Sequence, residues 1–245
     1  MHSREIAQTN RRFYDNLWSA GSVELPQRFN TWPLISQLLP SAPARLEAGA
    51  GLRPRLPIAG THFVDISPPA IMGLNARGGI AVLGEITALP YGDCRFDLVA
   101  AFDVIEHVEE HHLIFRELSR VLKDGATLIL SVPLHPASWT EFDEFVGHAR
   151  RYKPAELLAL IAEHGLVVEK SAEFGMKPGN PRLVRYGLRW LKRRRTAALW
   201  WYHRVFGPLG ILLQKRLEFA RGLIDTDRAQ GIVLVCRRQP RPPAL

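Results

Sequence analysis

Acidic residues stand at the ends of three successive short apolar runs, where they could bind one ligand together. Glu47 closes the first run in "LEAGAGLRP", Asp65 closes the second in "VDIS", and Glu85 follows the third in "GEITALP". A carboxylate in the second position can accept both hydroxyls of a ribose, and one in the third can accept from an adenine amino group. The three carboxylates favour a nucleoside that carries a positive charge, such as a sulfonium, and would repel a pyrophosphate.

Two glycines, Gly49 and Gly51, follow the first carboxylate, and glycine lets the backbone come close to a ligand. The dinucleotide-binding fingerprint GxGxxG is not completed, because Pro54 stands where its third glycine or alanine belongs. A hydride-transfer enzyme therefore ranks last among the functions considered. The backbone N–H of Ile86 is available to a ring nitrogen of an adenine.

Short apolar runs alternate with helical periodicity along the chain, and this alternation must position the carboxylates. Helices are expected from Ser67–Pro68 to Gly78, over 111–122 with a stop at Asp124–Gly125, and from Pro154 to Gly165. The pattern predicts an α/β fold, a Rossmann-like doubly wound sheet of seven strands, mostly parallel, whose strand ends meet at one edge. The runs that indicate buried strands cover 44–49, 61–66, 80–86, 96–102, 126–133, 166–174 and 231–238.

The order "LEAGAG … VDIS … GEITALPY … FDLVAAFDVIEHV … LSRVLKDGATLILSVP" resembles the class I S-adenosylmethionine-dependent methyltransferases. It is similar in particular to the small-molecule and lipid methyltransferases that have "EHV" after the fourth strand. The resemblance covers roughly residues 44 to 174, and 231–238 fits the antiparallel last strand that this family inserts beside the sixth. It implies that the chain is an enzyme and that its cofactor is S-adenosyl-L-methionine.

The resemblance also implies which residues bind the cofactor, from the methionine part to the adenine. Glu47, Gly49 and Gly51 would cradle the methionine part, Asp65 with Ile66 would take the ribose, Glu85 and Ile86 the adenine, and Phe102 and Asp103 would line the pocket floor.

Two departures from the family pattern bear on this expectation. Arg53 replaces the usual third glycine, and Pro54 and Pro57 lie in a short segment before the second strand, so the first helix is expected to be abbreviated. Arg53 would then weaken cofactor affinity or reach a carboxylate. A non-catalytic descendant of the family is the alternative that these departures leave open.

Methyl transfer from a sulfonium is an in-line displacement, so the protein must align the acceptor, exclude water and, for an oxygen or nitrogen acceptor, supply a base. The candidate residues lie on loops at the same edge: His107 after the fourth strand, and Asp143 and His148 after the fifth, in a loop that resembles the family's "H-x-RRY" stretch. Each histidine has a structural alternative, because His107 could pin the next helix and His148 could bond the loop to itself. The reaction needs no metal, and none is expected.

Three regions are expected along the chain. Residues 1–43 form an N-terminal helical cap with an aromatic cluster, 44–174 and 231–238 form the cofactor-binding core, and 175–230 form a basic, aromatic-rich helical insertion. By resemblance the cap is a lid over the cofactor site. The alternative is an ordinary helix packed on the sheet.

The formal net charge of +8 is concentrated in the last quarter of the chain, and a stripe of Arg182, Arg185, Arg189 and Lys192 is expected on a helix over 182–195. A basic amphipathic helix followed by tryptophans is typical of a segment that lies on an anionic membrane surface, here expected over 182–216. A small-molecule or lipid-linked methyl acceptor would suit such a segment. The alternative is a pair of helices that cover the acceptor pocket with their arginines in solvent.

Other functions and the cellular location follow from what the sequence lacks. RNA methylation would suit the Arg and aromatic residues, but no proline-proline-aromatic tetrapeptide or catalytic cysteine is seen, so nucleic acid is not the expected partner. Cys94 and Cys236 are far apart, which disfavours disulfides and thiolate metal sites and fits a reducing cytoplasm. The N-terminus has no secretory signal pattern, and no apolar run reaches the roughly 18 residues of a spanning helix. The expected location is cytoplasmic, and peripheral attachment to a membrane is an alternative that the sequence leaves open.

Overall fold

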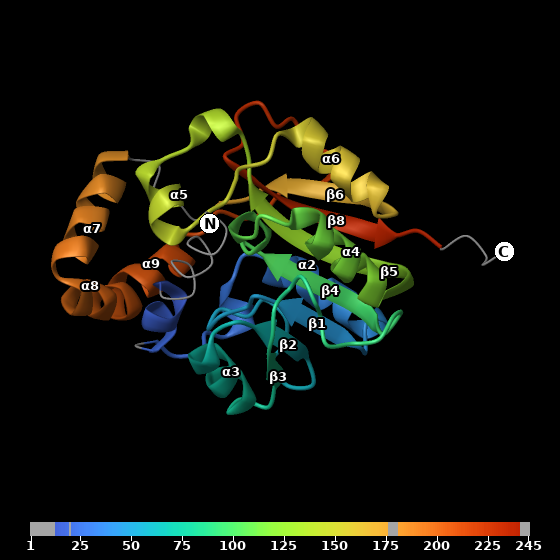
Figure 1. Ribbon diagram of the computed structural model, residues 1–245, viewed down its shortest axis with the longest axis horizontal. Helices are drawn as coiled ribbons and strands as arrows, with labels where there is room; N and C mark the ends of the chain where they lie inside the picture. Colours follow the sequence, from blue (N-terminus) through green and yellow to red (C-terminus); the bar gives the residue numbers. More distant parts are fainter. Residues whose placement is uncertain (1–12, 20, 176–180, 241–245) are drawn as a thin grey trace.

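One sheet organises the molecule, and its strands are joined by helices on both faces (Figure 1). The computed structural model describes residues 13–19, 21–175 and 181–240, and within them the sheet has eight strands in the order β3-β2-β1-β4-β5-β8-β6-β7. The strands are β1 (Arg45–Ala48), β2 (His62–Asp65), β3 (Ile80–Leu83), β4 (Phe96–Phe102), β5 (Leu122–Pro133), β6 (Leu166–Glu173), β7 (Ala220–Arg221) and β8 (Gly231–Arg238).

The sheet confirms the predicted doubly wound arrangement with an inserted antiparallel strand. β1 to β5 pair in parallel, and β8 lies between β5 and β6 and is antiparallel to both. The predicted count of seven strands is one too few, because β7 adds an eighth strand at the edge beside β6. A strand of two residues is too short to show an alternating pattern in the sequence.

Helices cover the two faces of the sheet. α4 and α6 pack on one face, where Ile114, Leu118 and Leu160 join the cluster around Leu128, and α2 packs on the other through Ile35. α3 and the helical residues 13–19 form a third cluster at the β2–β3 side. The helices of the sheet layers are α2 (Trp32–Leu38), α3 (Pro68–Asn75), α4 (His111–Val121), α5 (Glu141–Val146) and α6 (Pro154–Glu163), with short 3-10 turns at Pro26–Arg28, Leu39–Ser41, Ile105–His107 and Pro136–Ser138.

The end of α4 and the first crossover differ from the sequence expectation. α4 ends at Val121, and β5 begins at Leu122, so the predicted stop at Asp124–Gly125 is wrong and these two residues lie inside the strand. The first crossover, predicted to hold an abbreviated helix, has only turns over residues 49–61. Pro54 and Pro57 explain this, since proline restricts the residue before it to extended backbone and removes a helical donor.

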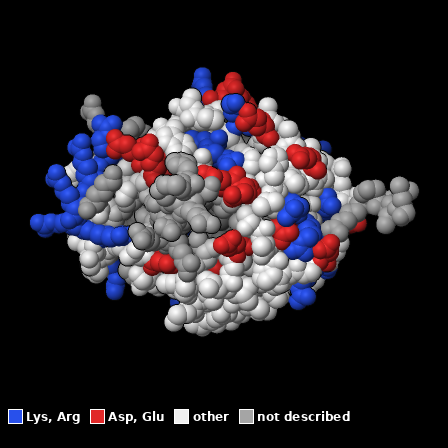
Figure 2. Space-filling model, viewed as in Figure 1, with Lys and Arg blue, Asp and Glu red and all other residues white. Residues whose placement is uncertain are grey.

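The insertion between β6 and β8 is a helical lobe beside the sheet (Figure 1). The helix predicted over 182–195 is interrupted, because Arg194 has non-helical backbone between α7 (Pro181–Arg193) and α8 (Arg195–Trp201). A π-helical turn, Tyr202–Phe206, and α9 (Gly207–Leu212) complete the lobe. Lys and Arg side chains gather at this end of the molecule (Figure 2). In the described residues no helix combines the length and apolarity that crossing a bilayer requires.

We expect the inserted strand β8 to be essential to stability. Leu234 is fully buried between β5 and β6, so Leu234→Ala should lower the free energy of unfolding by about 2–5 kcal/mol through lost transfer free energy and a residual cavity. Urea unfolding followed by circular dichroism measures the change. The control is Val167→Ala on exposed β6 surface, where a loss of about 0.5 kcal/mol or less is expected. Equal losses in the two variants would contradict the assigned burial.

Candidate functional site

The glycine turn after β1 is tied to the end of β2. Gly49 and Gly51 have φ of 72° and 54°, the left-handed region that glycine adopts without strain. The Gly51 N–H donates to Oδ2 of Asp65 at 2.8 Å, and the Ser67 N–H donates to Oδ1 at 2.9 Å. Burial raises the pKa of Asp65, and these two donors oppose the rise. Asp65 therefore fixes the turn from within, whatever else it binds.

Glu47 is buried and braces the loop that replaces the first helix. Its carboxylate accepts the backbone N–H groups of Arg55 and Leu56 at 2.9–3.0 Å. Burial raises its pKa to about 7, with the backbone donors acting in the opposite direction. Its predicted contact with a methionine group stays a prediction, because the described partners of this carboxylate are the loop's own backbone.

The remaining predicted cofactor residues reach the same edge of the sheet from β3 and β4, since the parallel register pairs Asp65 with Leu83 and Glu47 with Ala100. Asp103 has φ of 50° and its exposed carboxylate accepts the Ser131 hydroxyl at 2.7 Å. The structure brings together the turn, Asp65 and Asp103. The others divide by burial: Glu85 is exposed, Ile66 is half-buried, and Ile86 and Phe102 are buried.

Helix residues 13–19 lie over the glycine turn, and their role as a lid stays a prediction. Trp18 packs directly on Gly51, where an added Cβ would overlap the indole. Tyr14 stacks on Trp18 with ring centroids 5.8 Å apart. The carboxylates and the glycine backbone fit S-adenosylmethionine in chemistry. The Trp18 indole fills the space beside the Cα of Gly51.

Arg53 contacts the insertion, and its expected effect on cofactor affinity stays a prediction. Its guanidinium lies over the Tyr202 ring, 5.1 Å from the centroid, and thereby joins the glycine turn to the insertion. His203 adds a second link, because its Nε2 lies 2.8 Å from the Leu17 carbonyl in the helix over the turn. The turn, helix 13–19 and the insertion are therefore packed as one unit.

Tyr14 of this helix forms a pair with His107. Nδ1 of His107 lies 3.2 Å from the Gly147 carbonyl, so it carries the proton, and Nε2 is left to accept from the Tyr14 hydroxyl at 3.2 Å. Burial, with His148 nearby, lowers the pKa of His107 to about 3. Burial raises the pKa of Tyr14 well above its usual range. His107 is thus a neutral hydrogen-bond acceptor at physiological pH.

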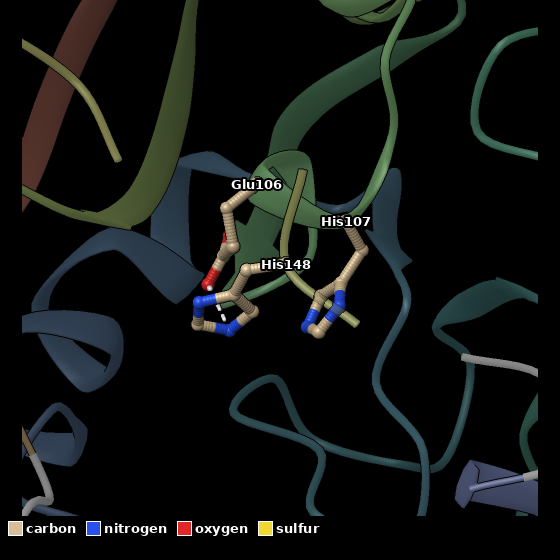
Figure 3. Close-up of side chains that lie close together, drawn as sticks. All are labelled: Glu106, His107 and His148. Atoms are coloured by element: carbon tan, nitrogen blue, oxygen red, sulfur yellow. Dashed lines mark ion pairs between the residues drawn. The ribbon is translucent and has the colours of Figure 1, made fainter. Parts of the chain in front are cut away.

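His148 stands beside His107, with ring centroids 4.6 Å apart, and Glu106 completes the cluster (Figure 3). Nδ1 of His148 donates to Oδ1 of Asp143 at 2.8 Å, and Nε2 lies 3.8 Å from Oε1 of Glu106. Because Asp143 fixes the tautomer, the lone pair of Nε2 is oriented into the cluster. This arrangement suits a general base.

Asp143 itself is a positioning group. It is fully buried and accepts from the Thr140 N–H and hydroxyl, from Nε and Nη2 of Arg151 and from His148. With its oxygens engaged in this way, it holds His148 and closes the capping box of α5. The structure brings His107, His148 and Asp143 together, as the sequence predicted for this edge.

Tyr14, Tyr202 and His203 are the contacts that the sequence did not indicate. Tyr14 lies in the N-terminal segment for which an aromatic cluster is predicted, but nothing in its spacing points to His107, 93 residues away. Tyr202 and His203 lie in the insertion and meet the glycine turn only through tertiary packing.

Comparison with known proteins relates the part of the chain that carries the glycine turn to methyltransferases. Residues 49–130 match a family model described as "Methyltransferase domain". The chain is 30% identical over 128 residues to malonyl-[acyl-carrier protein] O-methyltransferase of Herminiimonas arsenicoxydans, covering 49% of this chain and 48% of that protein. It is 34% identical over 80 residues to ajmaline N-methyltransferase of Rauvolfia serpentina, covering 29% and 28%. The matched segment thus spans about half or less of the length of these curated relatives.

Solved structures share the fold. A SAM-dependent methyltransferase of Thermotoga maritima aligns with a TM-score of 0.57 at 17% identity, covering 87% of this chain and 91% of that one. The [4+2]-cyclase SpnF aligns with a TM-score of 0.52 at 17% identity, covering 80% and 74%. Since the second is described as a cyclase, the shared fold alone does not decide the reaction.

The neutral state of buried His107 predicts a pH-dependent stability. The unfolded chain protonates this residue near pH 6.5 and the folded chain only near pH 3. Its contribution is therefore intact above pH 6.5 and is lost as the pH falls, by about 1.4 kcal/mol per pH unit for one proton. We expect the free energy of urea unfolding to fall more steeply from pH 6.5 to pH 4 in the wild type than in His107→Gln.

The comparison cancels the other titrating groups. Glu47, whose pKa is raised to about 7, acts in the opposite direction but is present in both proteins. His112→Gln, at an exposed position, is the control and should follow the wild-type curve. Parallel curves for wild type and His107→Gln would show that the imidazole is not held neutral.

Proposed function

Because the chain belongs, through residues 49–130, to the class I S-adenosylmethionine-dependent methyltransferases, we propose that it transfers a methyl group to a small-molecule or lipid-linked acceptor. The observation that carries the proposal is the adjacency of two groups of residues. The glycine turn with Asp65 and Asp103 forms one side, and the His148–Asp143 pair with His107 forms the other, both roofed by helix 13–19.

On the cofactor side, the glycine turn and the carboxylates of Asp65, Glu85 and Asp103 would contact the ligand. When bound, S-adenosylmethionine supplies an electrophilic methyl group on a sulfonium. Gly49 and Gly51 would let the backbone approach it, Asp65 would accept from the ribose, and Glu85 from the adenine amino group. The exposed Asp103 would favour the positive charge electrostatically.

The acceptor side supplies a base and an orienting group. His148 takes the acceptor proton on Nε2 while Asp143, bonded to Nδ1, stabilises the imidazolium that forms. His107, neutral under working conditions, accepts a hydrogen bond on Nε2, which Tyr14 now occupies. An acceptor hydroxyl or amine that displaces the Tyr14 hydroxyl would be held beside His148. Glu106, 3.8 Å from His148, adds a second carboxylate near the developing positive charge.

Aromatic side chains of helix 13–19 and α5 cover this site, which supports an acceptor with an apolar part. Phe13 packs edge-on against Phe145 of α5 at 5.5 Å, and Arg185 of α7 lies 3.7 Å from Glu141 at the start of α5. Helix 13–19, α5 and the insertion thus meet above the histidines. A lipid-linked acceptor would reach the site from a membrane surface, which makes peripheral membrane attachment part of the proposal.

Cofactor binding should depend on Asp65. We expect Asp65→Ala to abolish the binding of S-adenosylhomocysteine measured by isothermal titration calorimetry, because the ribose loses its acceptor and the Gly51 N–H loses its partner. Asp65→Asn, which keeps the size of the side chain, should also bind at least tenfold more weakly. Asp227→Ala, at an exposed position, is the control. Wild-type affinity in both Asp65 variants, with their folding verified by circular dichroism, would refute the ribose assignment.

Turnover should depend on the two histidines while cofactor binding does not. Cell extract is incubated with enzyme and isotopically labelled S-adenosylmethionine, and labelled products are followed by mass spectrometry. His148→Gln should lower the labelling rate by about 10²–10⁴-fold through loss of the base, and His107→Ala should lower it less, with S-adenosylhomocysteine affinity unchanged in both. Full labelling by His148→Gln would remove it from the mechanism. Label found in RNA instead of small molecules or lipids would overturn the acceptor class.

A further inference from the structure

Exposed apolar side chains are concentrated on the insertion. Of the fourteen large apolar side chains exposed in the described residues, eight lie between Tyr186 and Leu213, and Leu212 and Leu213 are 79% and 69% exposed. Soluble surfaces rarely gather such side chains in one place, and a gathering of this kind marks a site of interaction. The eight are Tyr186, Trp200, Trp201, Val205, Phe206, Leu209, Leu212 and Leu213.

The helical repeat explains why these side chains point outward together. Leu199, His203, Gly207 and Ile211 recur every four residues and are buried or half-buried. Leu199 joins the cluster of helix 13–19 and the glycine turn, and the π-helical turn at Tyr202–Phe206 keeps the four-residue repeat in register with that cluster. The exposed residues from Trp200 to Leu213, which we name the Trp200–Leu213 face, therefore lie on the opposite side, away from the body of the protein.

The charge along the segment that carries this face has one sign. Residues 185–216 contain nine Lys and Arg and no Asp or Glu. Arg193, Arg194 and Arg195 are exposed where α7 meets α8, and Arg204 is exposed within the π-helical turn. The space-filling view shows Lys and Arg gathered at the end of the molecule formed by α7 and α8 (Figure 2).

We propose that the Trp200–Leu213 face docks on the surface of an anionic lipid bilayer. Leu and Phe side chains would enter the acyl boundary, Trp200 and Trp201 would sit at the headgroup level, and the arginines would contact lipid phosphates. The face lies on the surface of the bilayer and does not span it, in agreement with the length of the described helices. The inference deepens the proposed function and rests on it only for the identity of a membrane-borne acceptor.

Two other occupants fit the face less well. RNA would use the arginines, but it would gain nothing from the strongly exposed Leu212 and Leu213. A second copy of the chain would bring two clusters of arginines together without an acidic partner on this face, and like charges across an interface disfavour it. A bilayer that carries negative headgroups satisfies both the apolar side chains and the arginines.

Docking would also place the membrane beside the reaction site. Tyr202 holds Arg53 of the glycine turn from the inner side of the same helical stretch, and His203 contacts Leu17 of the helix above it. One helix thickness, about 10 Å, therefore separates the docked surface from the roof of the site. An acceptor anchored in the bilayer could reach the histidines without leaving the membrane.

Vesicle flotation with the full chain tests the proposal. Wild-type protein should float with vesicles of 30% phosphatidylglycerol in phosphatidylcholine (roughly the anionic fraction that gives a surface potential of tens of millivolts) and should not float with phosphatidylcholine alone. Leu212→Asp/Leu213→Asp should lower the partition coefficient at least tenfold, since two apolar anchors are lost and two repelled charges are gained. Arg193→Glu/Arg194→Glu should lower it similarly. Met72→Asp, equally exposed on α3, is the matched control and should float as the wild type does.

Each other outcome has a defined meaning. Absence of flotation, equal flotation with neutral vesicles, or wild-type flotation of both double variants would overturn the proposal. A wild-type dimer that becomes a monomer in Leu212→Asp/Leu213→Asp by light scattering, with no flotation, would assign the face to a second copy. S-adenosylhomocysteine binding is measured on the same samples. Wild-type protein that floats but does not bind S-adenosylhomocysteine would contradict the proposed function and support docking. Wild-type protein that binds S-adenosylhomocysteine but does not float would contradict docking and leave the proposed function standing.

Discussion

The hydrogen bond from the Gly51 N–H to Asp65 is the contact on which the rest of the site depends. It joins the end of β1 to the end of β2 and holds the glycine in the left-handed region. Because Gly51 has no side chain, the Trp18 indole can pack on the turn and bring helix 13–19 over the carboxyl edge of the sheet. The same helix carries Tyr14, whose hydroxyl pairs with His107.

The loop that follows the turn and the insertion are both held by side chains at or next to the turn. Glu47 replaces the stabilisation that a first helix would give, by accepting two N–H groups of the loop that follows. Arg53 stands where the family usually has a small residue, and it uses its length to stack on Tyr202 of the insertion. The residue at this departure from the glycine pattern therefore joins the turn to the insertion.

The histidine cluster illustrates how burial and hydrogen bonding divide two similar groups. His107 has its Nδ1 proton on a backbone carbonyl, and burial lowers its pKa to about 3, which leaves it neutral. His148 has its Nδ1 proton on a carboxylate that Arg151 and Thr140 already hold in place. His107 suits a hydrogen-bond acceptor that orients the substrate, and His148 suits a base. The two residues are of the same type, and only their surroundings differ.

The sequence by itself determined the framework. The runs at 96–102 and 231–238 became β4 and β8 with the same bounds, and the parallel order brought Asp65, Glu85 and Asp103 to one edge, because buried strands require continuous apolar side chains and turns require glycine or proline. Only the tertiary structure decided what those residues contact. The partner of Glu47, the position of Trp18 on Gly51, the pairing of Tyr14 with His107 and the outward face of the insertion depend on which surfaces meet across long sequence separations. The local periodicity of the sequence indicates that a face is apolar, but it does not indicate which residues cover that face.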